Sequence, residues 1–169
     1  MNGVVRTVAC AWGWPNERIA AVNYERPGRG WWDNRVARAD TTPEVLAALA
    51  ERCERLAPDD QRLGFERALR LLSDMALAPK AVGEGGDDDT LWVALLADSG
   101  AYESAALALF PPQTVYSGGR LLDGAFVAQV ILPGGVGAHS RAAKSLAMAW
   151  LAALLRALAR EMIEARALH

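Results

Sequence analysis

The fold is decided by residues 131–166, which have the sequence ILPGGVGAHSRAAKSLAMAWLAALLRALAREMIEAR. A short apolar run leads into a glycine-rich turn at 133–137, then into a polar cluster, and then into a long apolar helix. Large apolar side chains recur along this helix at steps of four residues, at Leu146, Trp150, Leu154, Leu158 and Met162. Leucine and alanine residues flank this row, so the apolar face is wide. Because a face of this width has to be buried, the rest of the chain is expected to cover it.

The composition favours one globular domain with an ordinary core. The chain has 169 residues, of which 52% are hydrophobic and 22% are charged, and its formal net charge is −2. A charge this small gives no general attraction to nucleic acid or to an anionic membrane. No secretory signal is visible at the start, and the apolar segment 146–158 is too short to span a membrane. We therefore expect residues 1–169 to form a single cytoplasmic domain.

The N-terminal segment is predicted to begin with a β-hairpin. Residues 4–12 and 18–24 are rich in β-branched side chains and are separated by a turn that contains glycine and proline. The loop at 25–35 holds four candidate ligand-binding residues, Arg26, Arg29, Trp31 and Trp32. Arginine and tryptophan together suit bases and phosphates. The alternative is that the tryptophans pack onto the core while the arginines remain solvated.

A helical hairpin is predicted next. Thr41 is expected to cap a helix that runs to about Leu56, with Glu44 completing a capping box. Pro58 ends this helix and opens a second one, which stops before Pro79. The connection is too short for parallel helices, so the two are expected to form a hairpin.

The remaining elements complete a predicted α+β fold. Residues 80–89 are a linker rich in glycine and aspartate, followed by helices at 90–97 and 102–110. Strands at 113–117 and 125–132 form a second hairpin before the long helix. The expected architecture is two short β-hairpins packed with four to five helices, similar to an α-β-α sandwich. Its parts are the hairpin and helical hairpin at 1–79, the linker at 80–89, and the helix-hairpin-helix unit at 90–169.

Residues 89–160 carry two recurring packing patterns. These are YESAALALFP at 102–111 and AALLRALA at 152–159. With these patterns the chain resembles small proteins from phages and prophages of alphaproteobacteria, which are associated with the phage α-β-α sandwich domain. The resemblance covers under half of the chain, and the long helix opens with Lys144-Ser145 where the family often has Thr-Pro. It implies a phage origin and interference with a host system, and it transfers no catalytic residue.

The loop at 133–145 is the strongest candidate site. Its glycines let a ligand approach the backbone, and the N-terminus of the following helix offers unpaired amides. The candidate ligand-binding residues here are Gly135, Gly137, His139, Ser140, Arg141 and Lys144. This set suits a phosphate or a carboxylate, although the phosphate-loop motif G-x-x-x-x-G-K-[ST] is absent. The alternative is an ordinary loop in which Ser140 caps the helix.

Candidate catalytic residues are few. His139 and His169 are the only histidines in the chain, and neither Cys10 nor Cys53 lies in a nucleophile motif. Both cysteines are expected to be buried thiols in a reducing compartment. No Cys/His spacing fits zinc. A non-catalytic protein without a cofactor or metal is therefore expected; the enzymatic alternative is a metal-dependent phosphodiesterase that uses Asp87–Asp89.

Two functional hypotheses follow. The leading one is a phage-derived binding protein in the host cytoplasm that sequesters a small phosphorylated or nucleotide-like ligand, as a counter-defence sponge. The alternative is an inhibitor or adaptor that binds a host protein through exposed tryptophan and arginine side chains. No stable nucleic-acid or membrane partner is expected. Open hairpin edges and the very apolar last helix predict a homo-oligomer.

Overall fold

The computed structural model describes residues 41–74 and 86–167, and these residues form an α+β fold. The predicted strands at 4–12 and 18–24 and the loop with Arg26, Arg29, Trp31 and Trp32 lie outside the described residues. The described elements are, in chain order, α1 (Pro43–Arg55), the 3-10 helix η2 (Pro58–Asp60), α2 (Gln61–Asp74), α3 (Gly86–Asp98), α4 (Tyr102–Ala108), β1 (Val115–Arg120), β2 (Phe126–Ile131), β3 (Gly137–His139) and α5 (Leu146–Ala167).

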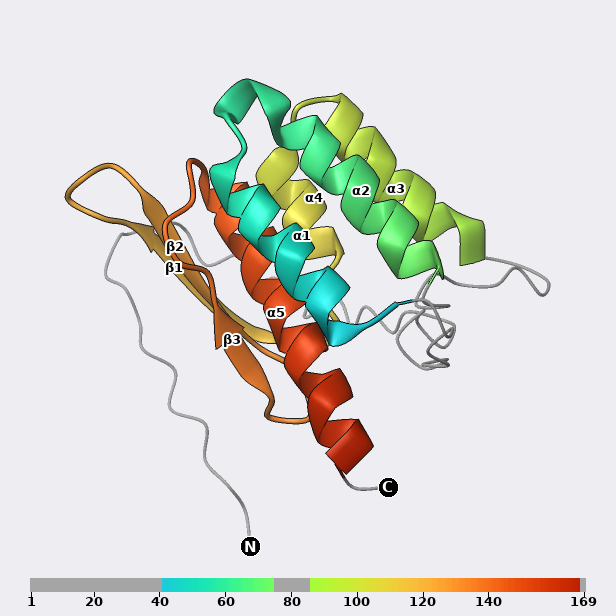
Figure 1. The fold of residues 1–169 in the computed structure, drawn as a ribbon. Coiled ribbons are helices and arrows are strands. Elements are labelled where there is room, and N and C mark those ends of the chain that lie inside the picture. The colour runs from blue at the N-terminus through green and yellow to red at the C-terminus, as the bar shows by residue number, and fades with distance from the viewer. Residues whose placement is uncertain (1–40, 75–85, 168–169) are drawn as a thin grey trace, which may run out of the picture.

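The long helix α5 is the centre of the molecule (Figure 1). The three strands pack against one side of it, and α1 and α4 pack against the other side. The helices α2 and α3 lie outside α1 and α4, farthest from the sheet. Because a helix that is apolar on most sides must be covered on most sides, this central position fits its sequence.

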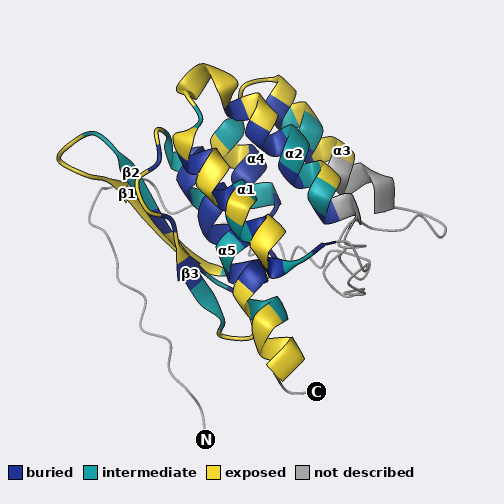
Figure 2. Ribbon diagram, in the orientation of Figure 1, coloured by how far each residue is buried: buried dark blue, intermediate teal, exposed yellow. Residues whose placement is uncertain are grey.

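Burial along α5 confirms that the helix is covered by several elements (Figure 2). Its buried residues do not follow one stripe but fill consecutive positions around the helix: Ala147, Met148, Ala149, Leu151, Ala152, Ala153, Leu154, Leu155, Ala157, Leu158 and Ala159. Many of them are alanines, which allow neighbouring helices to come close. No helix among the described residues combines the length and the hydropathy that a membrane crossing requires.

The sheet is antiparallel, with strand order β1-β2-β3. Side chains alternate across it, so Ala128, Val130 and Ala138 are buried toward α5 while Gln129 and His139 are exposed on the opposite face. In the described part of the chain, helices cover only the α5 side of this sheet. The hairpin predicted from the strands at 113–117 and 125–132 is confirmed, with its first strand displaced toward the C-terminus.

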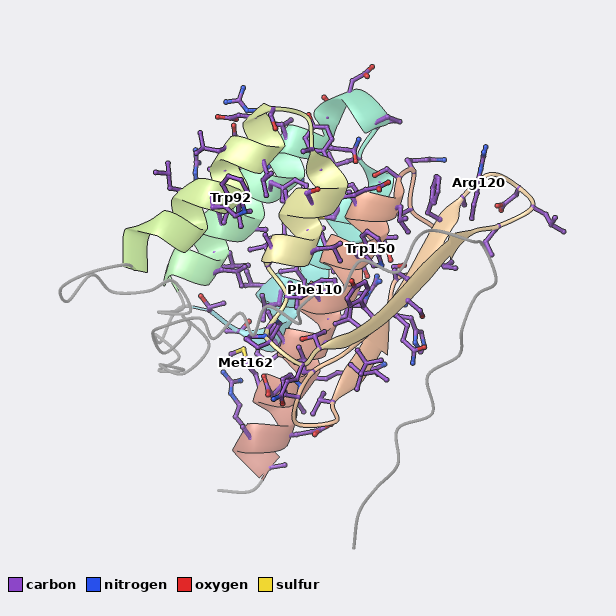
Figure 3. The ribbon with its side chains drawn as sticks, turned by 180° about the vertical axis from the view of Figure 1, so that it is seen from behind. Trp92, Phe110, Arg120, Trp150 and Met162 are labelled. Atoms are coloured by element: carbon purple, nitrogen blue, oxygen red, sulfur yellow. The ribbon has the colours of Figure 1, made fainter. Side chains whose placement is uncertain are left out.

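Aromatic contacts fix β1 over α5. The ring of Tyr116 lies edge-on to Phe110, with centroids 5.1 Å apart, and edge-on to Trp150, with centroids 5.8 Å apart. The indole Nε1–H of Trp150 also donates a hydrogen bond to the Ser117 carbonyl over 3.3 Å. Figure 3 shows Phe110 and Trp150 where the sheet meets α4 and α5. Edge-to-face rings of this kind stabilise a contact beyond the area they bury.

Two glycines allow elements to approach closely. A Cβ at Gly64 in α2 would lie 2.9 Å from the Met148 sulfur. A Cβ at Gly118 in β1 would lie 2.8 Å from Leu146 Cδ1 and 2.9 Å from Trp150 Nε1. At Gly64 the nearest atoms are the ends of flexible side chains, which can shift, whereas at Gly118 a Cβ would also meet the Trp150 ring and, at 3.3 Å, the Val127 backbone oxygen. Glycine at position 118 therefore favours the close approach of β1 to α5.

The sequence pattern does not predict a strand between the glycine-rich turn and the last helix. The turn instead closes a second hairpin, between β2 and β3. The amide of Gly135 donates to the Leu132 carbonyl, and the amide of Leu132 donates to the Val136 carbonyl, each over 2.8 Å. Gly135 has φ +85°, a left-handed conformation that glycine adopts without strain. The three-residue strand β3 therefore separates the glycines from α5.

Three helix starts differ from the predictions. The cap of α1 is Thr42 rather than Thr41, and its side chain makes no capping hydrogen bond, so the predicted capping box with Glu44 is wrong. Pro58 begins a 3-10 turn, and α2 starts only at Gln61. The helix α3 begins at Gly86, so Asp87–Asp89 belong to its first turn rather than to a linker.

A buried ion pair ties α1 to α5. Glu54 in α1 is only 6% exposed and pairs with Arg156 of α5 through both carboxylate oxygens, at 2.8 Å for the Oε2–Nη2 contact. The backbone amide of Arg141 donates to Glu54 Oε1 over 2.5 Å. Both carboxylate oxygens are thus hydrogen-bonded, which a buried charge requires.

The surroundings of Glu54 shift its pKa in opposing directions. Burial raises the pKa, but hydrogen bonds from Arg156 and from the Arg141 amide, together with the positive charges of both residues, outweigh burial and hold the pKa below its ordinary value. The hydrogen bond to Glu54 in turn raises the pKa of Arg156, against the effect of burial. The pair is therefore ionised at neutral pH.

We predict that Glu54→Gln destabilises the protein by about 3–5 kcal/mol at pH 7, because it leaves the Arg156 charge without its partner. The matched control is Glu51→Gln, which removes the exposed Glu51–Arg55 pair and should cost at most about 0.5 kcal/mol. Urea unfolding measures both values. A carboxyl with a lowered pKa stabilises the fold above the pKa of unfolded glutamate, about 4.3. The difference between wild type and Glu54→Gln should therefore narrow as the pH falls below about 4; an unchanged difference would contradict the assignment.

Candidate functional site

The predicted site loop is used largely to hold the sheet against the helices. Arg160 of α5 donates from Nη1 to the Gly137 carbonyl over 2.6 Å. One turn earlier, Arg156 donates to the His139 carbonyl over 3.2 Å. The Arg141 amide donates to Glu54 in addition. These contacts therefore engage backbone groups at positions 137, 139 and 141, the alternate residues that point away from β2.

The glycine turn and the N-terminus of α5 lie at opposite ends of this arrangement. Gly137 contacts Arg160, whereas Lys144 immediately precedes Ser145 and the first turn of α5. Between Leu146 and Arg160 an α-helix rises about 21 Å, at about 1.5 Å per residue. Gly135 and Lys144 therefore cannot surround one small ligand, as the sequence predicted for a single anion-binding loop.

Ser140 has a structural role that differs from both predictions. Its side chain is buried, and its Oγ accepts a hydrogen bond from the Ala128 amide over 2.8 Å. It therefore continues the pairing of β2 beyond the end of β3 instead of capping α5. Its neighbours Arg141 and Lys144 are exposed, and His139 is exposed on the open face of the sheet. Of the predicted residues in this loop, those four do not converge on one point.

The cap of α5 is Ser145, which belongs to a short polar chain. Its Oγ accepts a hydrogen bond from the Met148 amide over 3.3 Å and donates to Gln61 Oε1 over 2.6 Å. Gln61 is buried and donates from Nε2 to the Pro58 carbonyl over 2.8 Å. The chain thus links the start of α2 to the start of α5.

A cavity of about 340 Å³ opens beside this chain. The start of α4 forms its opposite wall, and its lining residues are Gln61, Gly100, Ala101, Tyr102, Glu103, Ser104, Ser145 and Ala147. Among the residues that line it there is no lysine or arginine, and Glu103 contributes a negative charge. The cavity therefore offers hydrogen-bonding groups rather than a built anion site.

A second, shallow groove of about 350 Å³ crosses the open face of the sheet. Ser117, Gln129 and His139 form a row across the three strands, since Ser117 pairs with Gln129 and Gln129 pairs with His139. The residues that line the groove are Ser117, Gly118, Gly119, Val127, Ala128, Gln129 and His139. His139 is its one predicted site residue.

An exposed apolar surface lies on α3. Leu91 and Trp92 are each 56% exposed, and Leu95 is 52% exposed. Asp98 follows on the same side of the helix at the next turn, and its carboxylate lies 2.9 Å from Arg62 Nε. Arg62 also pairs with Glu66 over 3.3 Å, so charged groups border one end of the apolar residues. Figure 3 shows Trp92 on α3, away from the sheet. We call Leu91, Trp92 and Leu95 the α3 surface.

Potential metal ligands and the described cysteine are placed as follows. No three His, Cys, Asp or Glu side chains within the described ranges gather closely enough to hold a metal ion. Cys53 is a buried free thiol. Burial, followed by the negative charge of Glu54, raises the pKa of Cys53 to about 12, which keeps it protonated and unreactive.

Sequence reasoning overlooked the α3 surface, although a signal for it exists. In α3 the buried residues Val93 and Ala97 mark the side that faces the core. Leu91, Trp92 and Leu95 add large apolar side chains at positions that cannot all share that side. One side of this helix is already buried in the core. Large apolar residues on another side therefore indicate an additional contact surface.

We predict that Ser145→Ala destabilises the protein by about 1–3 kcal/mol, because α5 loses its cap and Gln61 loses a hydrogen-bond partner. The matched control is Ser104→Ala, an exposed residue that lines the same cavity and should change stability by less than about 0.5 kcal/mol. Urea unfolding at neutral pH gives both values. Equal effects of the two substitutions would show that the polar chain does not contribute.

Comparisons of the chain with protein-family models, with curated proteins and with solved structures found no match. The resemblance to phage and prophage proteins therefore stays a prediction. The fold and the surfaces of the described residues are the physical basis for assigning a function.

Proposed function

We propose that the protein is a non-catalytic protein-binding module that docks on its partner through the α3 surface. The observation that carries this proposal is the exposed indole of Trp92 between two exposed leucines. Monomeric proteins rarely leave large apolar side chains together on the surface unless something binds there. Trp92 belongs to the residue type that contributes most often to binding energy at protein interfaces.

The arrangement of charges supports the same proposal. Apolar residues at the centre with charged residues at the border are typical of interface anatomy, because the border excludes water from the centre. Arg62, Glu66 and Asp98 supply such a border at the C-terminal end of α3. Since the ion pairs are exposed, they contribute little to stability and can exchange partners.

The sequence of α3 limits the chemistry of the partner. The helix GDDDTLWVALLAD contains four aspartates and neither lysine nor arginine. A complementary surface would present an apolar centre bordered by basic side chains, which would also steer the encounter. In the context of a phage origin, this protein would act as an inhibitor or adaptor of such a host protein.

Sequestration of a small ligand is a second candidate, which the cavity at the start of α5 favours. Its volume of about 340 Å³ is within the range of small-molecule sites. The first amides of α5 attract a negative group, and the neighbouring Lys144 adds a positive charge at the exposed rim. Glu103 opposes an anion in the same cavity. Nucleotide sequestration at this cavity is therefore less well supported than protein binding at the α3 surface.

We predict that Trp92→Ala weakens binding to the partner by about 30-fold or more, which corresponds to about 2 kcal/mol for an interface anchor. The partner is first purified from host extract with the wild-type protein, and its dissociation constant is then measured by calorimetry. Ile163→Ala is the control, because Ile163 on α5 is equally exposed at 55%.

The two variants should unfold at similar temperatures, so a loss of binding can be assigned to the surface itself. Affinity should also fall as salt is added if basic groups border the partner's apolar centre. Equal binding by Trp92→Ala and Ile163→Ala would exclude the α3 surface as the docking site.

For the second candidate, we predict that a nucleotide bound at the start of α5 raises the melting temperature of the wild type. At a ligand concentration of 100 times Kd, the stabilisation is about 2.7 kcal/mol. Lys144→Ala should reduce the shift, whereas Arg120→Ala, which removes an exposed charge in β1, should not. A screen in which no linear or cyclic nucleotide shifts the melting temperature would eliminate this candidate.

A further inference from the structure

We propose that the outer edge of β1 pairs with β1 of a second copy of the chain. The two strands would run antiparallel about a two-fold axis at Gly118, so that the two three-stranded sheets form one continuous sheet. This interaction surface is distinct from the α3 surface, which lies on the far side of the helices.

The two edges of the sheet differ in their hydrogen bonding. On β3 the outward carbonyls of Gly137 and His139 accept hydrogen bonds from Arg160 and Arg156. The Arg141 amide, which continues that edge, donates to Glu54. Side chains therefore occupy the outward carbonyls that β3 would offer to another strand, which disfavours strand addition on that side.

The edge of β1 has no comparable cover among the described residues. The Leu121 amide donates a hydrogen bond to the Ala125 carbonyl. In the β1–β2 register, hydrogen-bonded pairs alternate from this point, so Ser117 and Gly119 also bond to β2. By the alternation of an antiparallel ladder, Tyr116, Gly118 and Arg120 direct their amides and carbonyls away from β2. No described side chain bonds these groups, and all six residues of β1 are exposed.

The sequence of β1 also lacks the usual protections of an edge strand. Natural edges are shielded by proline, by charged side chains or by bulges. The strand VYSGGR has no proline, is paired with β2 without a bulge, and carries one charge at its last residue. Its outer edge is therefore open to pairing along most of its length.

An axis at Gly118 makes the strand complementary to itself. Gly118 would face Gly118 of the second copy, where no side chains can clash. Tyr116 would face Arg120 of the second copy, and a guanidinium over an aromatic ring is favourable. Val115 and Leu121, which are 63% and 43% exposed, would face each other at both ends of the paired segment. No like charges are opposed in this register.

The size of this contact sets the expected affinity. One strand pair with two apolar contacts buries less than the roughly 800 Å² per partner of a standard interface. Leu122, which is fully exposed at the tip of the hairpin, extends the apolar end of the strand. A dimer that forms at high protein concentration and dissociates on dilution is therefore expected.

The first test measures the mass of the full chain by light scattering and native mass spectrometry over a dilution series. The wild type should change from dimer to monomer. Val115→Lys combined with Leu121→Lys places positive charges opposite each other at both ends and should leave only monomer. Val115→Lys combined with Leu121→Glu restores complementary charges and should restore the dimer. Ile163→Lys, at an exposed site on α5, should not affect it.

A second test uses the proposed register directly. In the dimer Ser117 would lie opposite Gly119 of the second copy at a non-hydrogen-bonded pair, where Cα atoms are about 4.5 Å apart and a disulfide can form. A Cβ at Gly119 would meet no atom within 4 Å, so cysteine fits there. Ser117→Cys combined with Gly119→Cys should give a covalent dimer on mild oxidation, and neither single variant should do so.

Several outcomes would overturn the proposal. They are a wild type that is monomeric at every concentration, a dimer that persists with Val115→Lys and Leu121→Lys together, and a double-cysteine variant that oxidises without forming a covalent dimer. Circular dichroism and thermal unfolding of each variant confirm that the fold is retained, as expected for exposed positions.

Discussion

The pair between Glu54 and Arg156 is the interaction on which the arrangement of α1, α5 and the sheet depends. A carboxylate that is buried in this way is tolerated only if both of its oxygens are satisfied. Arg156 and the Arg141 amide provide this, and they come from the central helix and from the segment after β3. One side chain of α1 therefore fixes where α5 lies and where the chain leaves the sheet. Because a misplaced α1 would leave an unpaired buried charge, alternative packings of these apolar helices are disfavoured.

A second polar link acts at the other end of the same connection. Gln61 and Ser145 join the start of α2 to the start of α5. The segment between β3 and α5 is therefore anchored at both ends by hydrogen bonds that it donates to side chains of α1 and α2. The polar residues that made this segment resemble a ligand-binding loop are therefore partly used by the fold. Ser140 illustrates the point, since its hydroxyl group is occupied by the Ala128 amide. Functional surface has to be sought outside the connection, on α3 and on the sheet.

The sequence predicted the elements well where the signal was local. Helical periodicity and the prolines placed α1, α4 and α5, and the strands predicted at 113–117 and 125–132 overlap β1 and β2. The strand β3 was missed because Gly137-Ala138-His139 is short and lacks β-branched residues; it forms because the Gly135 turn brings it back along β2.

The site was less predictable. Glu54 and Arg156 are separated by 102 positions, and no local sequence pattern predicts their contact. Similarly, the sequence brought the glycines and Lys144 together in one loop, whereas β3 and the length of α5 separate them in space.

The hydrogen bonds that cover β3 also limit how far the sheet can extend. A sheet with two open edges can add chains indefinitely and grow into a fibre. Here Arg156 and Arg160 occupy one edge, so within the described ranges the open edge is that of β1. In the proposed dimer the outermost strand on each side would be a covered β3, and growth would stop at two chains. The same arginines that hold the sheet on α5 would thus act against polymerisation at the β3 edge.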